Sequence, residues 1–441
     1  MVRVRGSFMF GSRVVVTSAL VMLVACGGGG KVGMDASSGS DGAMHQGDGS
    51  TQQGDGGSGG VTCTTGTLFA GDPVYVGNPS DRPTSGTGIL ADPPLLWQTL
   101  LFADTHLYTR EEAEIWGVDL LSGSPVETKI TGTTPAGSSY PYNANNVPCG
   151  MATFTHILGL GALGDGSLVF SDSYAGAVIK IANPNNVSTC TVSVLAGNAT
   201  ASAGIDPSVT STLPAYAVTD GAGTAARFNA VGALVVDSQD NVYVVDNTAT
   251  DGQGKALLRK IDSAGNVTTV LTMPNNNPPT GPETIENLVT VGTTLYAASR
   301  NAINQGFVIK IDPVAKSLST VAGGGGSTWA PVDSAADPET SGIATDGQGF
   351  YVAGAGYVWY VTLAGQITLV AGTGVNIDNF PSGYDAKASH PALELALPTR
   401  IGPADEFGAS AIAQIAYHGG AVYYRGFADG TSDFIERITC K

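Results

Sequence analysis

Charged residues are scarce in this chain, and basic residues are scarcest of all. Only 13% of the 441 residues are charged, and 37 acidic against 20 basic residues give a net charge of -17. Such a charge repels phosphate backbones, so we expect no nucleic-acid partner. Low charge, 61 Gly and many Val, Thr and Tyr favour short strands with tight turns over helices.

The usual catalytic motifs are also missing. No Gly-x-Ser-x-Gly or Gly-rich phosphate loop stands at a predicted strand-to-helix junction, and no Cys-x-x-Cys occurs. The chain has only five His, and of these His156 and His390 alone fall in long connecting segments. The sequence therefore favours a protein without enzymatic activity, although it leaves the question open.

Long apolar runs are absent, and the longest near the N-terminus covers residues 14–25, after Arg3, Arg5 and Arg13. It is too short to span a bilayer and is typical of an export signal. Its end, Leu23-Val24-Ala25-Cys26, resembles the lipobox of bacterial lipoproteins. The resemblance implies cleavage after residue 25, acylation of Cys26 and attachment to a membrane; an ordinary secretory peptide is the alternative.

Residues 26–60 are rich in Gly and Ser and contain almost no large apolar side chain. Such a segment buries too little apolar surface to fold, so we expect a disordered tether. Gly27, where lipoproteins kept in the inner membrane often have Asp, favours the outer membrane. The folded domain is therefore predicted to be residues 61–441, held in the cell envelope as a monomer.

Short alternating strands repeat six times within residues 61–441. Period-two alternation with turns this short predicts antiparallel meanders. The second strands of the repeats are expected at 106–109, 168–171, 242–245, 295–298, 350–353 and 421–424. The third strands are expected at 115–118, 178–181, 258–261, 308–311, 358–361 and 435–438.

A recurring Ala-Gly tag marks the end of the fourth strands. It is clear at 194–197, 320–323 and 369–372 and looser at 129–132 and 269–272. The sixth repeat lacks a fourth strand, whereas residues 66–71 carry the tag with no strands before them. We therefore predict an all-β, six-bladed β-propeller of four-stranded blades in which the N-terminal strand completes the last blade.

The third repeat resembles the NHL repeat of β-propellers. It reads Asp-Gly-x-Gly-x-x-Ala-x-Phe over residues 220–228, then Val-Val-Asp at 235–237, Asn-Val-Tyr-Val-Val-Asp at 241–246 and Leu-Arg-Lys-Ile at 258–261. The resemblance covers about residues 63–440, and only this repeat has the full motif. It implies the propeller fold, and some propellers with this repeat are lyases or lactone hydrolases.

Besides Cys26, the chain has four cysteines in what we expect to be an oxidising compartment. Three pairings are possible. Ring closure should bring Cys63 to Cys440, which would leave Cys149 for Cys190; free buried thiols are the alternative.

The long connecting segments all fall on one face of the predicted propeller, and loops on a rigid scaffold commonly bind ligands. The positions just after the second strands include Glu111, Asp172, Asp246 and Arg425. The three carboxylates near one channel mouth could hold calcium or a cationic ligand group. Alternatively, Asp172 and Asp246 accept backbone hydrogen bonds, and Glu111 pairs with Arg425.

Three functions fit these observations. We expect a membrane-anchored extracytoplasmic binding module that takes an envelope protein or a glycan on its loop-rich face. The first alternative is a metal-dependent lyase or lactonase that uses the channel carboxylates, with calcium as the possible cofactor. The second is a structural protein of the envelope.

Overall fold

The computed structural model divides the chain into two units, Met1–Ser58 and Gly59–Lys441. The predicted signal peptide, Cys26 and the tether lie outside the described residues. In the described part of the chain, no helix is long and apolar enough to cross a membrane. The structure describes residues 61–71, 99–111, 113–121, 127–132, 143–173, 175–197, 218–247, 256–274, 281–301, 305–324, 329, 342–354, 356–374, 384–385, 388–397, 415–428 and 432–441.

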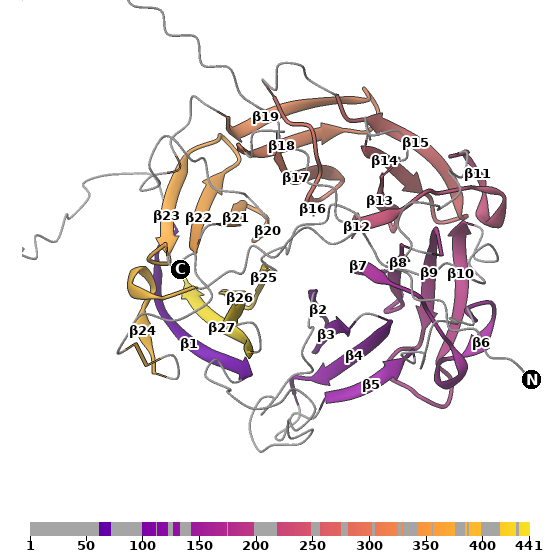
Figure 1. Cartoon of the computed structure of the whole chain (residues 1–441), viewed down its shortest axis with the longest axis horizontal. Coiled ribbons are helices and arrows are strands. Elements are labelled where there is room, and N and C mark those ends of the chain that lie inside the picture. Colours follow the sequence, from indigo (N-terminus) through magenta and orange to yellow (C-terminus); the bar gives the residue numbers. More distant parts are fainter. Residues whose placement is uncertain are drawn as a thin grey trace, which may run out of the picture. The chain divides into compact units, whose positions relative to one another are not determined.

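Six antiparallel sheets, each a blade, form a β-propeller within Gly59–Lys441, as predicted (Figure 1). Blade one contains β2 (Leu100–Ala103), β3 (His106–Glu111), β4 (Glu114–Asp119) and β5 (Glu127–Thr131). Blade two contains β6 (Val147–Pro148), β7 (Ile157–Ala162), β8 (Leu168–Asp172), β9 (Ala177–Ala182) and β10 (Thr191–Gly197). Blade three contains β11 (Gly221–Ala222), β12 (Val231–Val236), β13 (Val242–Asn247), β14 (Ala256–Ile261) and β15 (Asn266–Thr272).

The other three blades follow in chain order. Blade four contains β16 (Asn287–Val291), β17 (Thr294–Arg300), β18 (Gly306–Asp312) and β19 (Ser317–Gly323). Blade five contains β20 (Gly342–Thr345), β21 (Gly349–Gly354), β22 (Tyr357–Thr362) and β23 (Ile367–Ala371). Blade six contains β24 (His390–Pro391), β25 (Ile415–His418), β26 (Ala421–Ala428), β27 (Ser432–Cys440) and the N-terminal strand β1 (Cys63–Gly71).

The first strands β2, β7, β12, β16, β20 and β25 are innermost, and each contacts the next around a closed ring (Figure 1). The hydrophobic core lies between neighbouring blades. Tyr296 of blade four, for example, packs on Phe350 of blade five with 4.6 Å between ring centres. The equivalent Tyr108, Tyr243 and Tyr351 are at most 3% exposed, so this Tyr column is packing.

The recurring Ala-Gly tag marks a β-bulge. In all six blades the pairing of the third with the fourth strand skips one residue just before the tag or its looser version. Gly197, Gly323 and Gly372 then adopt φ between 94° and 96°, a region that favours glycine. A Cβ on Gly323 would lie 2.1 Å from the carbonyl oxygen of Gly306. The tag is therefore a backbone requirement of the blade.

Three 3-10 turns were not predicted: η2 (Cys149–Met151), η3 (Gly223–Ala225) and η4 (Ala392–Glu394). Each follows a two-residue strand (β6, β11 or β24) that pairs with the outer strand of its own blade. Buried apolar residues after the turn anchor the chain before it reaches the first strand, namely Ala152 and Phe154, Ala226 and Phe228, and Leu395 and Leu397. We call these three stretches the lead-in segments.

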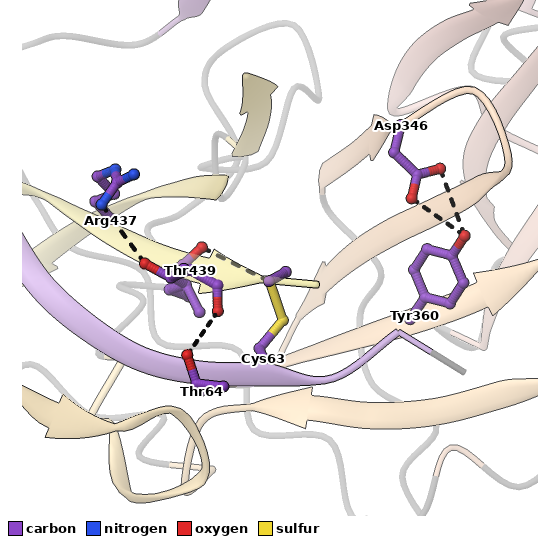
Figure 2. The surroundings of a disulfide bond; sticks show 8 residues. Cys63, Thr64, Asp346, Tyr360, Arg437 and Thr439 are labelled. Carbon is purple, nitrogen blue, oxygen red and sulfur yellow. Dashed lines mark hydrogen bonds between the residues drawn. A yellow bond between two sulfur atoms is a disulfide. The ribbon is translucent and has the colours of Figure 1, made fainter. Parts of the chain in front are cut away.

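The ring closes as predicted, because β1 pairs with β27 through seven residue pairs from Cys63–Cys440 to Gly71–Phe434. A disulfide joins Cys63 to Cys440, and the Thr64 hydroxyl donates to the Thr439 carbonyl at 3.5 Å (Figure 2). The second predicted disulfide also forms. It joins Cys149 in η2 to Cys190 before β10 and so fixes the lead-in segment of blade two.

Candidate functional site

The second strand of each blade ends where the first strand begins, and this end is the loop-rich face. In blades two and three the pairs are Asp172 with Ile157 and Asp246 with Val231. The predicted site residues therefore lie at this end of the blades. Most of the long connecting segments that define the face are outside the described residues.

Asp172 is fully buried and forms part of the scaffold of blade two. Its carboxylate accepts hydrogen bonds from the N–H groups of Thr155 and His156, from the N–H of Ala175 and from the Thr155 hydroxyl. Burial raises the pKa of Asp172, whereas these donors lower it. The carboxylate thus fixes the end of the lead-in segment to the second strand.

Asp246 has the same role in blade three and adds an ion pair. It accepts from the N–H groups of Asn229 and Ala230, at 2.9 and 3.1 Å, and lies 2.9 Å from the guanidinium of Arg259. Both side chains of this pair are fully buried. Burial raises the pKa of Asp246, and the N–H groups and Arg259 oppose that effect.

Arg259 joins several residues of the third repeat. Its second amino group donates to Asp220 at 2.9 Å and to the carbonyl of Thr219 at 3.0 Å. Its guanidinium lies 4.9 Å from the ring centre of Phe228. The Phe, the Arg and the last Asp of the motif therefore form one buried cluster, and the half-exposed first Asp at its edge joins the lead-in segment to the blade. Sequence reasoning missed Arg259.

Blade four uses another ion pair at the same end. Glu286, just before β16, lies 2.9 Å from the guanidinium of Arg300 at the end of β17, and both are largely buried. The Ser299 hydroxyl donates to the carbonyl of Thr284 at 2.5 Å. These contacts again tie the start of the first strand to the end of the second.

Arg110 and His156 form a polar contact region between blades one and two. The Arg110 guanidinium donates to the Thr99 hydroxyl at 3.1 Å, and this hydroxyl donates to the carbonyl of Leu158 in blade two. Burial, reinforced by the charge of Arg110, lowers the pKa of His156 to about 3. His156 is therefore neutral at physiological pH. The single sequence gives no signal for this arrangement.

The strand register changes one predicted equivalence. Asp172 pairs with Ala177, a residue of the third strand shortly before the bulge in its pairing with the fourth strand. The residue at the same register in blade six is Gly426, which pairs with Phe434. Arg425 is one residue earlier and corresponds to Arg110 of blade one. The second strand of blade six begins at Ala421 as predicted, but residues 422–425 are the ones whose pairing corresponds to that of residues 168–171 in blade two. Glu111 keeps its equivalence, and its side chain lies outside the described residues.

Glu436 is a buried acid that sequence reasoning also missed. It occupies in β27 the register of Arg259 in β14, but Gly426 stands where blade three has Asp246. Glu436 is 5% exposed, and no described residue donates a hydrogen bond to it or pairs with its charge. Burial raises its pKa to about 8. Its position two residues before the buried Ile438, on the same side of the strand, was the available signal that it faces inward.

Gly66 makes room for this carboxyl group. A Cβ on Gly66 would lie 2.9 Å from Oε1 of Glu436 and 2.4 Å from a methyl group of Leu395. The acid is thus enclosed between the strand that closes the ring and the lead-in segment of blade six.

Among the described residues, no group of three or more His, Cys, Asp or Glu is arranged to hold a metal ion. His390 packs on Tyr384 and its Nε2 contacts the carbonyl oxygen of Asp385 at 2.7 Å. Asp172 and Asp246 belong to separate hydrogen-bond networks in blades two and three. A role of Glu111, Asp172, Asp246 and Arg425 in ligand binding stays a prediction.

No family model matches the chain, and no curated protein has a similar sequence. Similar solved structures include a structural-genomics protein of unknown function from Bacteroides thetaiotaomicron, with 13% identity, 87% of this chain and 77% of that chain covered, and a TM-score of 0.47. Virginiamycin B lyase from Staphylococcus aureus has 12% identity, coverage of 78% and 94%, and a TM-score of 0.40. A protein proposed to be a gluconolactonase has 9% identity, coverage of 78% and 89%, and a TM-score of 0.43. These likenesses do not decide between binding and catalysis.

Proposed function

We propose that the protein is a lipid-anchored extracytoplasmic binding module that takes a protein or a glycan on its loop-rich face. Two disulfides in one domain are typical of oxidising compartments. Acylation at Cys26 would attach the module to the membrane, with the outer membrane as the destination that Gly27 favours, and residues 26–60 would serve as its tether.

The use of Asp172 and Asp246 in the scaffold carries this proposal. Calcium takes six to eight oxygen ligands, and carboxylates in such sites point their oxygens at the ion. Here both carboxylates are directed at backbone N–H groups, and Asp246 is neutralised by Arg259. They are therefore poor candidates for a calcium-dependent lyase or lactonase centre.

His156 is likewise poorly suited to acid–base chemistry. A general base works best when its pKa is near the operating pH. With a pKa of about 3, His156 has little tendency to accept a proton near neutrality. A neutral imidazole beside Arg110 is better suited to hydrogen bonding with a ligand or with a connecting loop.

Binding would then depend on the connecting loops and on Arg425, which is half-buried at the loop-rich end of blade six. A guanidinium at this place suits a carboxylate of a peptide or of an acidic glycan. In a strongly acidic protein, such a cation would select the orientation of the ligand more than it would raise overall attraction.

The test is binding of the full-length Cys26→Ser protein to an array of acidic and neutral glycans, together with affinity capture from a solubilised envelope extract. We expect saturable binding that Arg425→Ala weakens and that replacing residues 201–215 by a short Gly-Ser linker reduces. Lys180→Ala, on the opposite face, is the matched control and should bind normally.

Two results would overturn the proposal. Stoichiometric bound calcium that is lost in Asp172→Asn would favour the metal-dependent enzyme. No glycan binding and no enriched partner, with the loop replacement changing nothing, would leave a structural envelope protein as the better interpretation.

A further inference from the structure

The face opposite the loop-rich face carries exposed apolar residues at repeated positions. We call it the short-turn face, because the turns from first to second and from third to fourth strands meet there; the N–H of Leu120, for example, donates to the carbonyl of Thr105. Four blades place a large apolar side chain at the third-to-fourth turn, namely Leu121 (77% exposed), Val187 (71%), Val314 (91%) and Leu363 (46%). We call these four residues the apolar tips.

The other two exposed large apolar side chains, Met151 and Leu393, belong to η2 and η4. These turns contact the ends of the fourth strands of the preceding blades, where the Thr131 hydroxyl donates to the carbonyl of Cys149 and the N–H of Gly372 donates to the carbonyl of Ala392. Four of the six large apolar side chains that are exposed among the described residues therefore lie at third-to-fourth turns.

Capping hydrogen bonds hold two of the tips in place. The Asp119 carboxylate accepts from the N–H of Leu121 at 2.9 Å. The Asp312 carboxylate accepts from the N–H groups of Val314 and Ala315. Such Asx turns are locally rigid, so the apolar side chains are presented outward at little further entropic cost.

The chain continues toward its N-terminus from this same face. Thr62 and Lys441 exchange two backbone hydrogen bonds of 2.9 Å, next to the Cys63–Cys440 pair. In the closing blade this pair of ends takes the place of the third-to-fourth turn. The 34 residues between Cys26 and Val61 therefore join the described part of the chain at Val61, on the side of the apolar tips.

The charge near the tips indicates which lipid surface fits. Backbone N–H groups hold the pKa of Asp312 below its ordinary value, and Asn266 does the same for Asp262 in the equivalent turn of blade three. These carboxylates are ionised at neutral pH and would be repelled by anionic headgroups. A zwitterionic surface carries no such penalty.

We propose that the short-turn face rests on the zwitterionic lipid surface to which the protein is anchored, with the apolar tips in the interface and the loop-rich face turned away. This inference rests on the proposed anchor at Cys26. Each tip is small, and the anchor supplies the high local concentration that makes such weak contacts effective. The arrangement leaves the loops accessible to a partner.

The experiment uses the acylated full-length protein on phosphatidylcholine vesicles. Single cysteines at Leu121, Val314 and, as a control, the exposed Thr272 at the loop-rich end of β15 carry an environment-sensitive fluorophore. We expect a blue shift and quenching by nitroxide lipids at Leu121 and Val314, and neither effect at Thr272. Val314→Asp in the Leu121-labelled protein should reduce the quenching, and anionic lipid should reduce it as well.

Three results would overturn the inference. Labels at all positions that stay water-like on floated vesicles would show that the anchor holds but the face does not dock. Lipid contact at Thr272 instead of at the tips would show the opposite orientation. Failure of the protein to float would refute the anchor, and docking with it.

Discussion

Replacement of Glu436 by Gln should change how the stability of the protein depends on pH. Glu436 is 5% exposed and enclosed by β1 and the lead-in segment of blade six, and burial raises its pKa to about 8. In the unfolded chain its pKa returns to near 4.5. Between these two values the folded state keeps a proton that the unfolded state has released.

This difference fixes the sign and the size of the effect. The stabilising contribution is complete below pH 4.5 and is lost as the pH rises to about 8, because the unfolded state binds fewer protons there. Each pH unit is worth about 1.4 kcal/mol, so the whole interval corresponds to at most about 5 kcal/mol. Gln has a similar shape and does not titrate, so Glu436→Gln should lack this slope.

The assay is urea denaturation of the wild type and of Glu436→Gln at intervals from pH 5 to pH 9. The difference in the free energy of unfolding should shift in favour of the variant as the pH rises, by several kcal/mol in total. Glu394→Gln, an exposed acid in the same lead-in segment, is the control and should follow the wild type. Parallel curves for the wild type and Glu436→Gln would refute the reasoning.

The remaining predictions concern contacts that hold the blades together, each measured by urea denaturation. Arg259→Met leaves the carboxylate of Asp246 buried without its cation and should cost about 3–5 kcal/mol, and adding Asp246→Leu should restore part of the loss. Cys63→Ser with Cys440→Ser opens a cross-link of 377 residues and should cost up to about 5 kcal/mol; an unchanged midpoint would contradict closure as a source of stability. Gly323→Ala, at φ 94°, should cost more than about 1 kcal/mol.

The number of blades and the closure of the ring could be predicted because both depend on short sequence patterns, namely strand alternation and the recurring Ala-Gly tag. Alternation shows which residues face a neighbouring blade, as with Tyr243 and Tyr351. The tag that ends the fourth strand recurs at residues 66–71 without strands before it, so the N-terminal strand had to complete another blade. The Cys63–Cys440 disulfide followed from that topology.

The polar contacts at the loop-rich end could not be predicted, because their partners come from different elements. Arg259 meets Asp220 and Asp246 only after the lead-in segment folds back over the blade. Arg425 corresponds to Arg110 and not to Asp172, because the strand register in blade six differs by one residue from the predicted register. Alternation in so short a strand does not determine the register to one residue. The sequence places Glu436 at a buried register of the third strand, the one that Arg259 occupies in blade three. It does not show that Gly426 stands where blade three has the charged partner Asp246.

Metal content and stability, measured together on the wild type, Asp172→Asn and Asp246→Asn, test the central claim most directly. The claim is that these carboxylates hold the blades and that binding belongs to the loops. We predict no stoichiometric calcium in the purified wild type and a clear fall in the free energy of unfolding for both variants, because each carboxylate accepts buried backbone N–H groups. One bound calcium per chain, lost in both variants without loss of stability, would contradict the claim.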